Sequence, residues 1–224
     1  MKWFFLGLLI LILAPLCAAL IRTLLMGHKR SDYTPRPEPK RAAKYAGILS
    51  KMVRCETVSR PEVDQREKFL AFHNLLEVLF PLVHENLDKT ELDGNLLYFW
   101  KGRSSEKPIV LMSHQDVVPA EGTWSHPPFS GDIAEGKVWG RGASDTKCSV
   151  MAFFQAVEEL LGEGFVPPQD IYLSSSRTEE FAGPGCQMLV DELKSRGVKP
   201  WARMGYTALA MEAKNTGKQC QGIN

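Results

Sequence analysis

The sequence has almost no excess of charge of either sign. Its 224 residues include 27 Lys and Arg against 26 Asp and Glu, which gives a formal net charge of +1. Proteins that bind nucleic acid as their main ligand usually carry a basic surplus, because they must neutralise phosphates. The balanced charge therefore predicts no nucleic-acid partner.

Cysteines are few, and none of them forms a recognisable motif. The five are Cys17, Cys55, Cys148, Cys186 and Cys220, and no two show CxxC spacing. This scatter excludes a zinc ribbon and a dense disulfide framework. The sequence also has no internal repeat. Its hydrophobic fraction of 44% suits an ordinary globular core and excludes disorder, collagen and coiled coil as descriptions of the whole chain.

Charge is missing altogether from the segment that follows Lys2. Residues 3–21 carry no charged side chain, and Arg22 ends the run. Nineteen apolar residues are enough for a helix to cross the hydrocarbon core of a membrane. An apolar run at the N-terminus, followed by a polar segment, argues against a core helix of a soluble protein. Residues 1–26 are therefore predicted to be a signal peptide or a signal anchor.

The two interpretations of this leader have different consequences. A signal peptide would be cleaved near the small residues Cys17-Ala18-Ala19 and release a secreted, extracellular protein. An uncleaved leader would keep the protein membrane-anchored in the secretory pathway, and the membrane would then be contacted only through this segment. Basic residues lie on both sides of the run, so the charge rule does not choose an orientation. Cleavage would leave four cysteines and permit one disulfide, with no pairing readable from the sequence.

Residues 27–40 are predicted to be a linker, because Pro35, Pro37 and Pro39 alternate with charged residues and favour an extended chain. From residue 41 the hydrophobic pattern becomes periodic. Helices are expected from residue 41 to 53, from an N-cap at Ser59 to Phe80, and over 149–161 and 186–196. Strands are expected over 95–100, 109–112 and 171–173, with a turn at 102–107 and a hairpin at Glu135-Gly136. This alternation predicts an α/β fold, a sheet sandwiched by helices.

The first polar cluster follows the predicted strand 109–112. In an extended segment, His114 and Asp116 point the same way. The imidazole could then bind a metal while the carboxylate orients it from behind. A hydrogen-bonded histidine at a strand end is the alternative for an isolated triplet of this kind. The other four histidines lie in no ligand-like context and are expected on the surface or in loops.

The second polar cluster, Gly140-Arg-Gly-Ala-Ser-Asp145-Thr-Lys147, stands directly before a predicted helix. Its two glycines allow a tight turn and a close approach to neighbouring backbone. Asp145 could cap the helix or bridge two cations with its two oxygens. A phosphate-binding loop is a weaker interpretation, because the full GxGxxG pattern and a preceding Rossmann strand are both missing.

The third polar cluster is the pair Glu179 and Glu180, which follows the predicted strand 171–173 and precedes a Gly-Pro-Gly turn. Adjacent acids are commonly a solvated pair. At the end of a buried strand they could instead diverge, so that one binds metal and the other handles a proton.

Together the three clusters resemble a known family. The strings that carry the resemblance are Leu111-Met-Ser-His-Gln-Asp-Val-Val-Pro119, the stretch 124–147 with Pro128-Phe129 and Gly140-Arg-Gly-Ala, and Glu179-Glu180. They are similar, in order and spacing, to the zinc metallopeptidase family of aminoacylase and carboxypeptidase S. The apolar leader and the Lys147-x-Ser-Val-Met151 continuation further resemble its secreted branch of N-fatty-acyl-amino-acid synthases/hydrolases. The resemblance runs from about residue 41 to 199.

The resemblance implies a three-layer sandwich around a central mixed sheet and a zinc-dependent hydrolase. Two zinc ions would be held in the complete family site. His114 would bind one zinc, Asp145 would bridge the two, and Glu180 would bind one of them. Asp116 would orient His114, and Glu179 would be the general base for a metal-activated water. The substrate would be a small molecule, an N-acyl amino acid or a dipeptide-like compound, whose amide bond is cleaved or reversibly formed. The oligomeric state stays open.

The resemblance fades after Pro200. Family members are considerably longer and add a further metal-binding carboxylate and a metal-binding His. We therefore expect residues 41–200 to be the N-terminal part of a zinc hydrolase domain, incomplete at the C-terminus, and 201–224 to be a divergent tail. Such a truncated chain is expected to show no more than trace hydrolysis. The alternative function is a catalytically inactive isoform that acts, if at all, as a secreted or membrane-tethered binding fragment.

Overall fold

The structure is a computed structural model that describes residues 2–26, 37–61, 63 and 65–205. The chain divides into two compact units, Met1–Glu38 and Pro39–Asn224. Most of the expected linker and most of the expected tail lie outside the described residues. The expected boundaries at 26, 40 and 200 therefore stay predictions.

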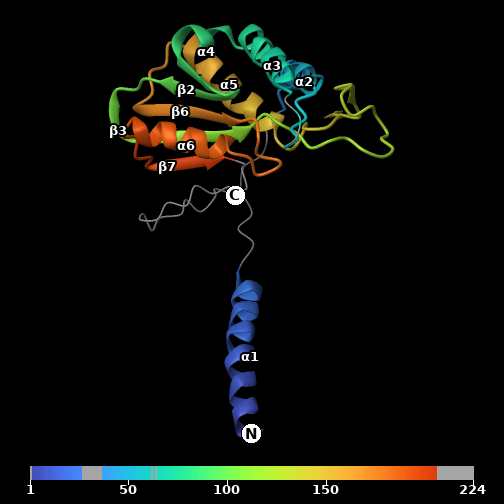
Figure 1. Ribbon diagram of the computed structural model, residues 1–224, viewed down its shortest axis with the longest axis vertical. Coiled ribbons are helices and arrows are strands. Elements are labelled where there is room, and N and C mark those ends of the chain that lie inside the picture. The colour runs from blue at the N-terminus through green and yellow to red at the C-terminus, as the bar shows by residue number, and fades with distance from the viewer. Residues whose placement is uncertain (1, 27–36, 62, 64, 206–224) are drawn as a thin grey trace. The chain divides into compact units, whose positions relative to one another are not determined.

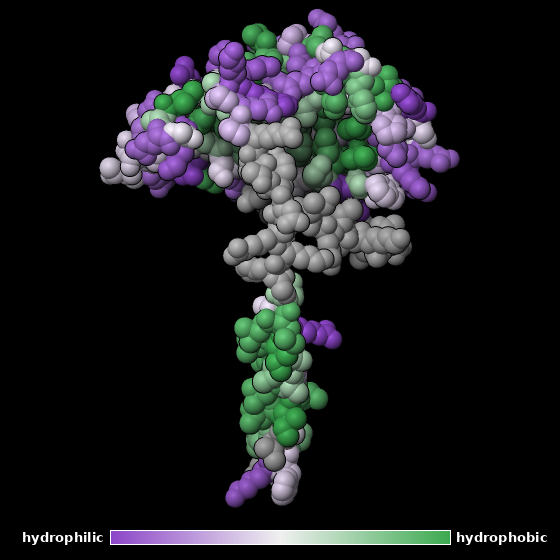
Figure 2. Space-filling model, turned by 180° about the vertical axis from the view of Figure 1, so that it is seen from behind, coloured by the Kyte–Doolittle hydropathy of each residue, from purple (hydrophilic) through white to green (hydrophobic). Residues whose placement is uncertain are grey.

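The first unit contains one long helix, α1 (Lys2–Leu25), which has Pro15 in its interior. Twenty-four residues at 1.5 Å each span about 36 Å, somewhat more than the roughly 30 Å hydrocarbon core of a bilayer. Figure 2 shows an almost continuous hydrophobic surface along α1. Among the described residues, it is the one helix long and apolar enough to cross a membrane. The hydroxyl of Thr23 donates a hydrogen bond to the Ala19 carbonyl at 2.9 Å, so this polar group is satisfied inside the helix.

The second unit is built on a five-stranded sheet with the order β1-β2-β6-β3-β7. The strands are β1 (Asp88–Leu92), β2 (Asn95–Trp100), β3 (Ser104–His114), β6 (Gln169–Ser176) and β7 (Ala202–Gly205). Strand β3 pairs in parallel with both β6 and β7, whereas β1–β2 and β2–β6 are antiparallel. The sheet is therefore mixed, and two of its parallel strands, β3 and β6, lie side by side at its centre.

Helices cover both faces of this sheet (Figure 1). They are α2 (Pro39–Val53), α3 (Arg66–Leu79), α4 (Pro81–Asn86), α5 (Lys147–Gly162) and α6 (Gly185–Ser195). Helices α2 to α5 pack on one face, and α6 packs on the other. This is the expected three-layer α/β sandwich with a mixed sheet, and that prediction is confirmed.

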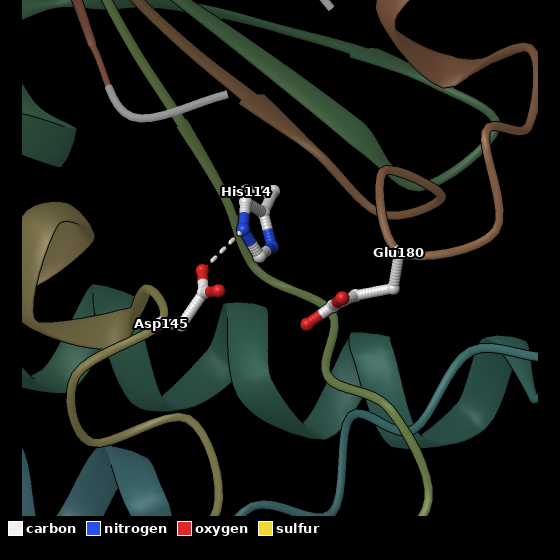
Figure 3. Close-up of side chains that lie close together, drawn as sticks. All are labelled: His114, Asp145 and Glu180. Atoms are coloured by element: carbon white, nitrogen blue, oxygen red, sulfur yellow. Dashed lines mark hydrogen bonds and ion pairs between the residues drawn. The ribbon is translucent and has the colours of Figure 1, made fainter. Parts of the chain in front are cut away.

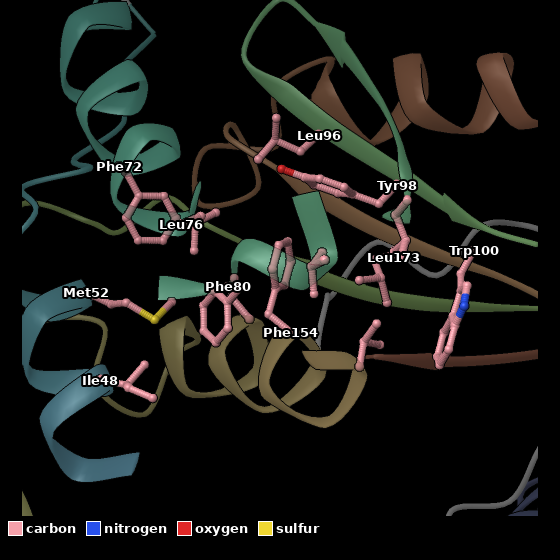
Figure 4. Close-up of a cluster of buried hydrophobic side chains, with 14 residues drawn as sticks. Ile48, Met52, Phe72, Leu76, Phe80, Leu96, Tyr98, Trp100, Phe154 and Leu173 are labelled. Carbon is pink, nitrogen blue, oxygen red and sulfur yellow. The ribbon is translucent and has the colours of Figure 1, made fainter. Parts of the chain in front are cut away.

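The larger hydrophobic core lies between the sheet and helices α2 to α5 (Figure 4). Alternate residues of β2 serve the two faces, because side chains in a strand point in opposite directions. Leu96, Tyr98 and Trp100 enter the larger core, and Leu97 enters the smaller core beneath α6. Three aromatic rings, each from a different part of the chain, fill the centre of the larger core. The centre of the Phe154 ring lies 5.4 Å from that of Phe80 and 5.2 Å from that of Tyr98.

Most of the expected elements are present. The predicted helices over 41–53, 149–161 and 186–196 correspond to α2, α5 and α6, and the three predicted strands correspond to β2, β3 and β6. The expected hairpin consists of β4 (Ile133–Ala134) and β5 (Lys137–Val138). Its turn residues Glu135 and Gly136 both have positive φ, at 54° and 72°. Those angles match the two-residue turns whose twist suits a hairpin.

Two expectations about local structure are wrong. Helix α3 begins at Arg66 with Gln65 at the cap position, so Ser59 does not cap it. The hydroxyl of Ser59 instead donates a hydrogen bond to a carboxylate distant in sequence. The segment 102–107 is only partly a turn, because β3 already begins at Ser104. Residues Ala202–Gly205, within the expected tail, form the edge strand β7, and the expected divergence of that tail stays a prediction.

Strand β1 has no counterpart among the expected elements. Its sequence, Asp-Lys-Thr-Glu-Leu, is charged and exposed, as edge strands often are, and it lacks a clear apolar alternation. The signal that marks it is the dipeptide Asp93-Gly94 between β1 and β2. Both residues have positive φ, at 48° and 76°, and Asp-Gly is a strong hairpin signal.

The aromatic group of the core gives a direct test of this packing. Replacing the buried Phe154 by Ala removes a ring that packs against Phe80, between α3 and α4, and against Tyr98 of the sheet. We expect the free energy of unfolding to fall by about 3–5 kcal/mol, measured by chemical denaturation. Val78→Ala is the control, because Val78 on α3 is 78% exposed, and it should change the free energy of unfolding by less than about 0.5 kcal/mol. Similar losses in both variants would contradict the described core.

Candidate metal centre

The three polar clusters meet at one edge of the sheet. His114 is the last residue of β3, and Glu179 and Glu180 lie in the loop between β6 and α6. Strands β3 and β6 are parallel neighbours, and His114 is paired with Ser176 at their ends. Asp145 comes to the same place from the loop that precedes α5. This is the carboxyl edge of the parallel strands, where α/β sheets usually form their sites.

The side chains of His114, Asp145 and Glu180 converge (Figure 3). One ligand atom from each lies within 4.8 Å of the other two. The Nε2 atom of His114 is 3.0 Å from Oδ1 of Asp145 and 3.7 Å from Oε2 of Glu179. His114 is buried, whereas the side chain of Asp145 is 60% exposed, so the cluster opens to solvent on the Asp145 side. The structure thus brings together all the residues that the sequence singled out here.

Asp116 lies behind His114, and it is fully buried. The Nδ1 atom of His114 is 3.1 Å from the Asp116 backbone carbonyl and 3.3 Å from its Oδ1. The other carboxylate oxygen, Oδ2, accepts hydrogen bonds from the Ser59 hydroxyl at 2.6 Å and from the Glu180 amide at 3.0 Å. One carboxylate therefore contacts the histidine and also holds the backbone of the loop that carries Glu180.

The electrostatics of the cluster are those of a cation site. Burial alone lowers the pKa of His114, but the carboxylates of Asp116 and Glu179 outweigh it and raise that pKa to about 9. Burial raises the pKa of Glu180, and the neighbouring acids Asp116, Asp145 and Glu179 raise it further, against a lowering by His114. Four carboxylates around one imidazole leave an excess of negative charge.

The glycines of the second cluster serve close packing. A Cβ atom on Gly140 would lie 2.5 Å from the side chain of Val53 and 2.8 Å from the carbonyl of Pro128. A Cβ atom on Gly142 would lie 2.5 Å from the side chain of Val117. Both glycines also have positive φ, at 144° and 83°. This packing accounts for the glycine pair without a bound phosphate.

Lys147 fastens the loop of Asp145 to the rest of the domain. Its side chain is fully buried, and the ammonium donates hydrogen bonds to the carbonyls of Met52 and Cys55, at and just beyond the end of α2. The same nitrogen lies 5.3 Å from the centre of the Phe72 ring. Burial lowers the pKa of Lys147 to about 8. A basic group near the C-terminus of a helix also meets the negative end of the helix dipole.

Sequence reasoning missed several residues that support the site. His73, expected on the surface, is buried in α3, and its Nε2 is 2.8 Å from Oε1 of Gln115. Gln115 also donates from its amide to the Gly94 carbonyl at 2.8 Å. Gln115 stands between His114 and Asp116 in the chain, so the contacts of its side chain help to hold the backbone that carries these two residues. The signal available for His73 was its place among the apolar residues Phe69, Phe72 and Leu76 of one helix.

Comparison with known proteins agrees with the geometry. Residues 110–216 match the family described as Peptidase family M20/M25/M40. The chain is 44% identical over 144 residues to probable carboxypeptidase S-like 2 of Dictyostelium discoideum, which covers 60% of this chain and 28% of that protein. It is 37% identical over 177 residues to N-fatty-acyl-amino acid synthase/hydrolase PM20D1.1 of Danio rerio, covering 75% of this chain and 34% of that protein. The chain thus spans about a third of the length of these curated relatives.

The fold is also similar to that of a solved structure, the M20 family metallo-carboxypeptidase Sso-CP2 of Sulfolobus solfataricus. The TM-score is 0.58 at 19% identity, over 72% of this chain and 36% of that one. The sequence matches, rather than this likeness in fold, bear out the suspected family, which is a metal-dependent one. By this sequence match, and in agreement with the mixed sheet and the three converging clusters, residues 110–216 carry a domain of peptidase family M20/M25/M40.

Proposed function

We propose that this chain carries the catalytic residues of a zinc-dependent hydrolase that cleaves, or reversibly forms, the amide bond of N-acyl amino acids or small peptides. The observation that carries the proposal is the convergence of His114, Asp145 and Glu180 within 4.8 Å at the carboxyl edge of the sheet. The reaction class is supported by the relatives, since one is described as carboxypeptidase S-like and another as an N-fatty-acyl-amino acid synthase/hydrolase.

The residues present fit a zinc ion. One imidazole nitrogen and carboxylate oxygens are typical donors for zinc in catalytic sites, which keep a further position open. The excess of negative charge in the cluster also calls for a cation. His114 and Glu180 would each hold a zinc ion, and Asp145 would bridge two with its two carboxylate oxygens. The second zinc and the bridge follow from the family resemblance.

Asp116 is assigned as the residue that orients His114. The carboxylate and backbone carbonyl of Asp116 face Nδ1, so the proton of the neutral imidazole belongs on that nitrogen. Nε2, which lies 3.0 Å from Oδ1 of Asp145, would then offer its lone pair to a metal in place of a proton. Partners of this kind set the tautomer of metal-binding histidines and raise their basicity.

Glu179 is assigned as the general base. Its side chain is only 11% exposed, and its Oε2 lies 3.7 Å from the nitrogen that would hold the metal. Zinc, when bound, lowers the pKa of a water molecule and polarises an amide carbonyl. Glu179 would accept the proton of the attacking water at its carboxylate and return that proton to the leaving nitrogen. In the reverse direction the same carboxylate would take the proton from the amine.

We also propose that α1 directs the chain into the secretory pathway, with secretion after cleavage as the favoured outcome. Its length and apolar surface support entry into a membrane, and Cys17-Ala18-Ala19 offers the small residues of a cleavage site. A membrane-anchored form is the alternative.

The two neighbouring glutamates give a matched test of the site. Glu180→Gln replaces a ligand by a neutral amide and should weaken zinc binding at least about tenfold, measured by competition with a chromophoric chelator. Glu179→Gln should leave zinc affinity unchanged. In a full-length relative built on this N-terminal part, it should lower the kcat for an N-acyl amino acid by about 10²–10⁴-fold, because only the base is lost.

The control for these variants is Glu106→Gln, which makes the same change at the opposite end of β3 from His114. It should alter neither zinc affinity nor turnover. If Glu179→Gln and Glu180→Gln lost zinc equally, the proposed division of roles between them would be wrong.

The leader is tested by expressing the chain in a secreting cell. We expect protein recovered from the medium to begin shortly after Ala19, since cleavage follows the small residues, and N-terminal sequencing would establish this. Recovery only in the membrane fraction, with Met1 retained, would favour the anchor instead.

A further inference from the structure

A pocket of about 410 Å³ lies next to the candidate metal centre. Three groups of residues line it: Ser59, Arg60, Pro61 and Val63 before α3; Val118, Pro119 and Glu121 after β3; and the pair Glu180 and Phe181. This volume lies within the range of roughly 300–1,000 Å³ that is usual for small-molecule sites. Of the residues with a proposed role in the metal centre, Glu180 alone is among those that line the pocket.

Two of the walls are fastened together at their base. Val58 and Val117 form a parallel β-bridge, with the Ser59 amide donating to the Val117 carbonyl at 3.1 Å and the Val117 amide donating to the Thr57 carbonyl at 2.9 Å. Because the bridge is parallel, the two lining segments that follow Val58 and Val117 leave it on the same side. The pocket is therefore built on backbone hydrogen bonds, and its position relative to β3 is fixed.

The pocket is connected to the metal centre through Asp116. Ser59 and Glu180 both line the pocket, and both donate to the same oxygen of Asp116, Ser59 from its hydroxyl and Glu180 from its amide. Glu180 is at the same time one of the three converging ligand residues. A ligand whose amide bond lies at the metal centre therefore has this pocket beside it.

The chemistry of the lining selects one end of an N-acyl amino acid. Most of the lining is apolar, contributed by Pro61, Val63, Val118, Pro119 and Phe181. Its charged residues are two acids, Glu121 and Glu180, and one base, Arg60. Among the described residues the lining thus has no surplus of positive charge to attract the carboxylate end of such a molecule. The uncharged acyl end gains from burial against these apolar side chains.

We propose that this pocket binds the apolar acyl chain of an N-acyl amino acid. The inference rests on the proposed function for the kind of ligand, and it adds the location of the acyl group and the side chains that select it. Val63 and Val118 stand on two different walls, and Phe181 follows Glu180 on the third. These residues would then select ligands by the length of the acyl chain rather than by the identity of the amino acid.

The test is binding of N-acylglycines of increasing acyl length to the full chain, by titration calorimetry below their micelle concentrations, with and without zinc. Each buried methylene is worth about fourfold in the dissociation constant. N-octanoylglycine should therefore bind at least about 100-fold more tightly than N-acetylglycine, even if only part of the chain is buried. Val63→Asp should remove most of this gain, because it places a charge on one wall.

Val63 is 52% exposed, so the substitution is compatible with folding, and Val118→Asp repeats the test on the second wall. Val78→Asp, the same change at the 78% exposed position on α3, should keep the full gain. A gain that survives both pocket variants would show that the acyl chain binds elsewhere, for example on α1, and would overturn the proposal, as would no gain at all. A gain that the pocket variants remove, in a chain that binds no zinc, would refute the metal centre and leave the pocket standing.

Discussion

The buried carboxylate of Asp116 is the interaction on which the candidate site depends. A carboxylate with no access to water is costly unless its oxygens are paired or hydrogen-bonded. Asp116 meets this demand with partners from three parts of the chain: the imidazole of His114, the hydroxyl of Ser59 and the backbone amide of Glu180. Satisfying one buried charge therefore also sets the orientation of one proposed ligand and the loop position of another.

The sheet supplies the rigid frame for this arrangement. Because β3 and β6 are parallel and adjacent, the segments that leave their carboxyl ends start close together, and the histidine and the glutamate pair meet without long connections. Asp145 reaches the same place differently. Its loop is held by two glycines packed against neighbouring segments and by the buried ammonium of Lys147 at the end of α2. The position of Asp145 thus depends on helix packing, whereas the positions of His114 and Glu180 depend on the register of the strands.

The parts of this structure that could be predicted from sequence are those with a local cause. The periodicities of α2, α5 and α6, the apolar runs of the central strands and the Glu135-Gly136 turn are all contained in short windows. The three polar clusters were likewise visible, because each follows a strand or precedes a helix. Their convergence followed from the general behaviour of parallel sheets and from the family resemblance.

The parts that could not be predicted depend on distant partners. Ser59 resembles a helix cap locally, but its hydroxyl bonds to a carboxylate 57 residues away. His73 resembles a surface residue by type, but it is buried because Gln115, 42 residues away, offers a hydrogen bond. The charged strand β1 is stable only as the edge partner of β2. The partners of Ser59 and His73 and the pairing of β1 are tertiary contacts, and the local signals for His73 and β1 give no information about those partners.

The electrostatics of the cluster link metal binding to proton release. Asp116, Asp145, Glu179 and Glu180 surround one imidazole, and positive charge nearby relieves their mutual repulsion. A proton on His114 supplies one such charge, which is why its pKa rises to about 9 although burial alone would lower it. A divalent cation supplies two charges and needs the same Nε2 lone pair, so a bound metal and a proton on that nitrogen exclude each other. The carboxylates that make the site attractive to a cation therefore also make the imidazole hold its proton, and metal affinity in such a site must fall with decreasing pH.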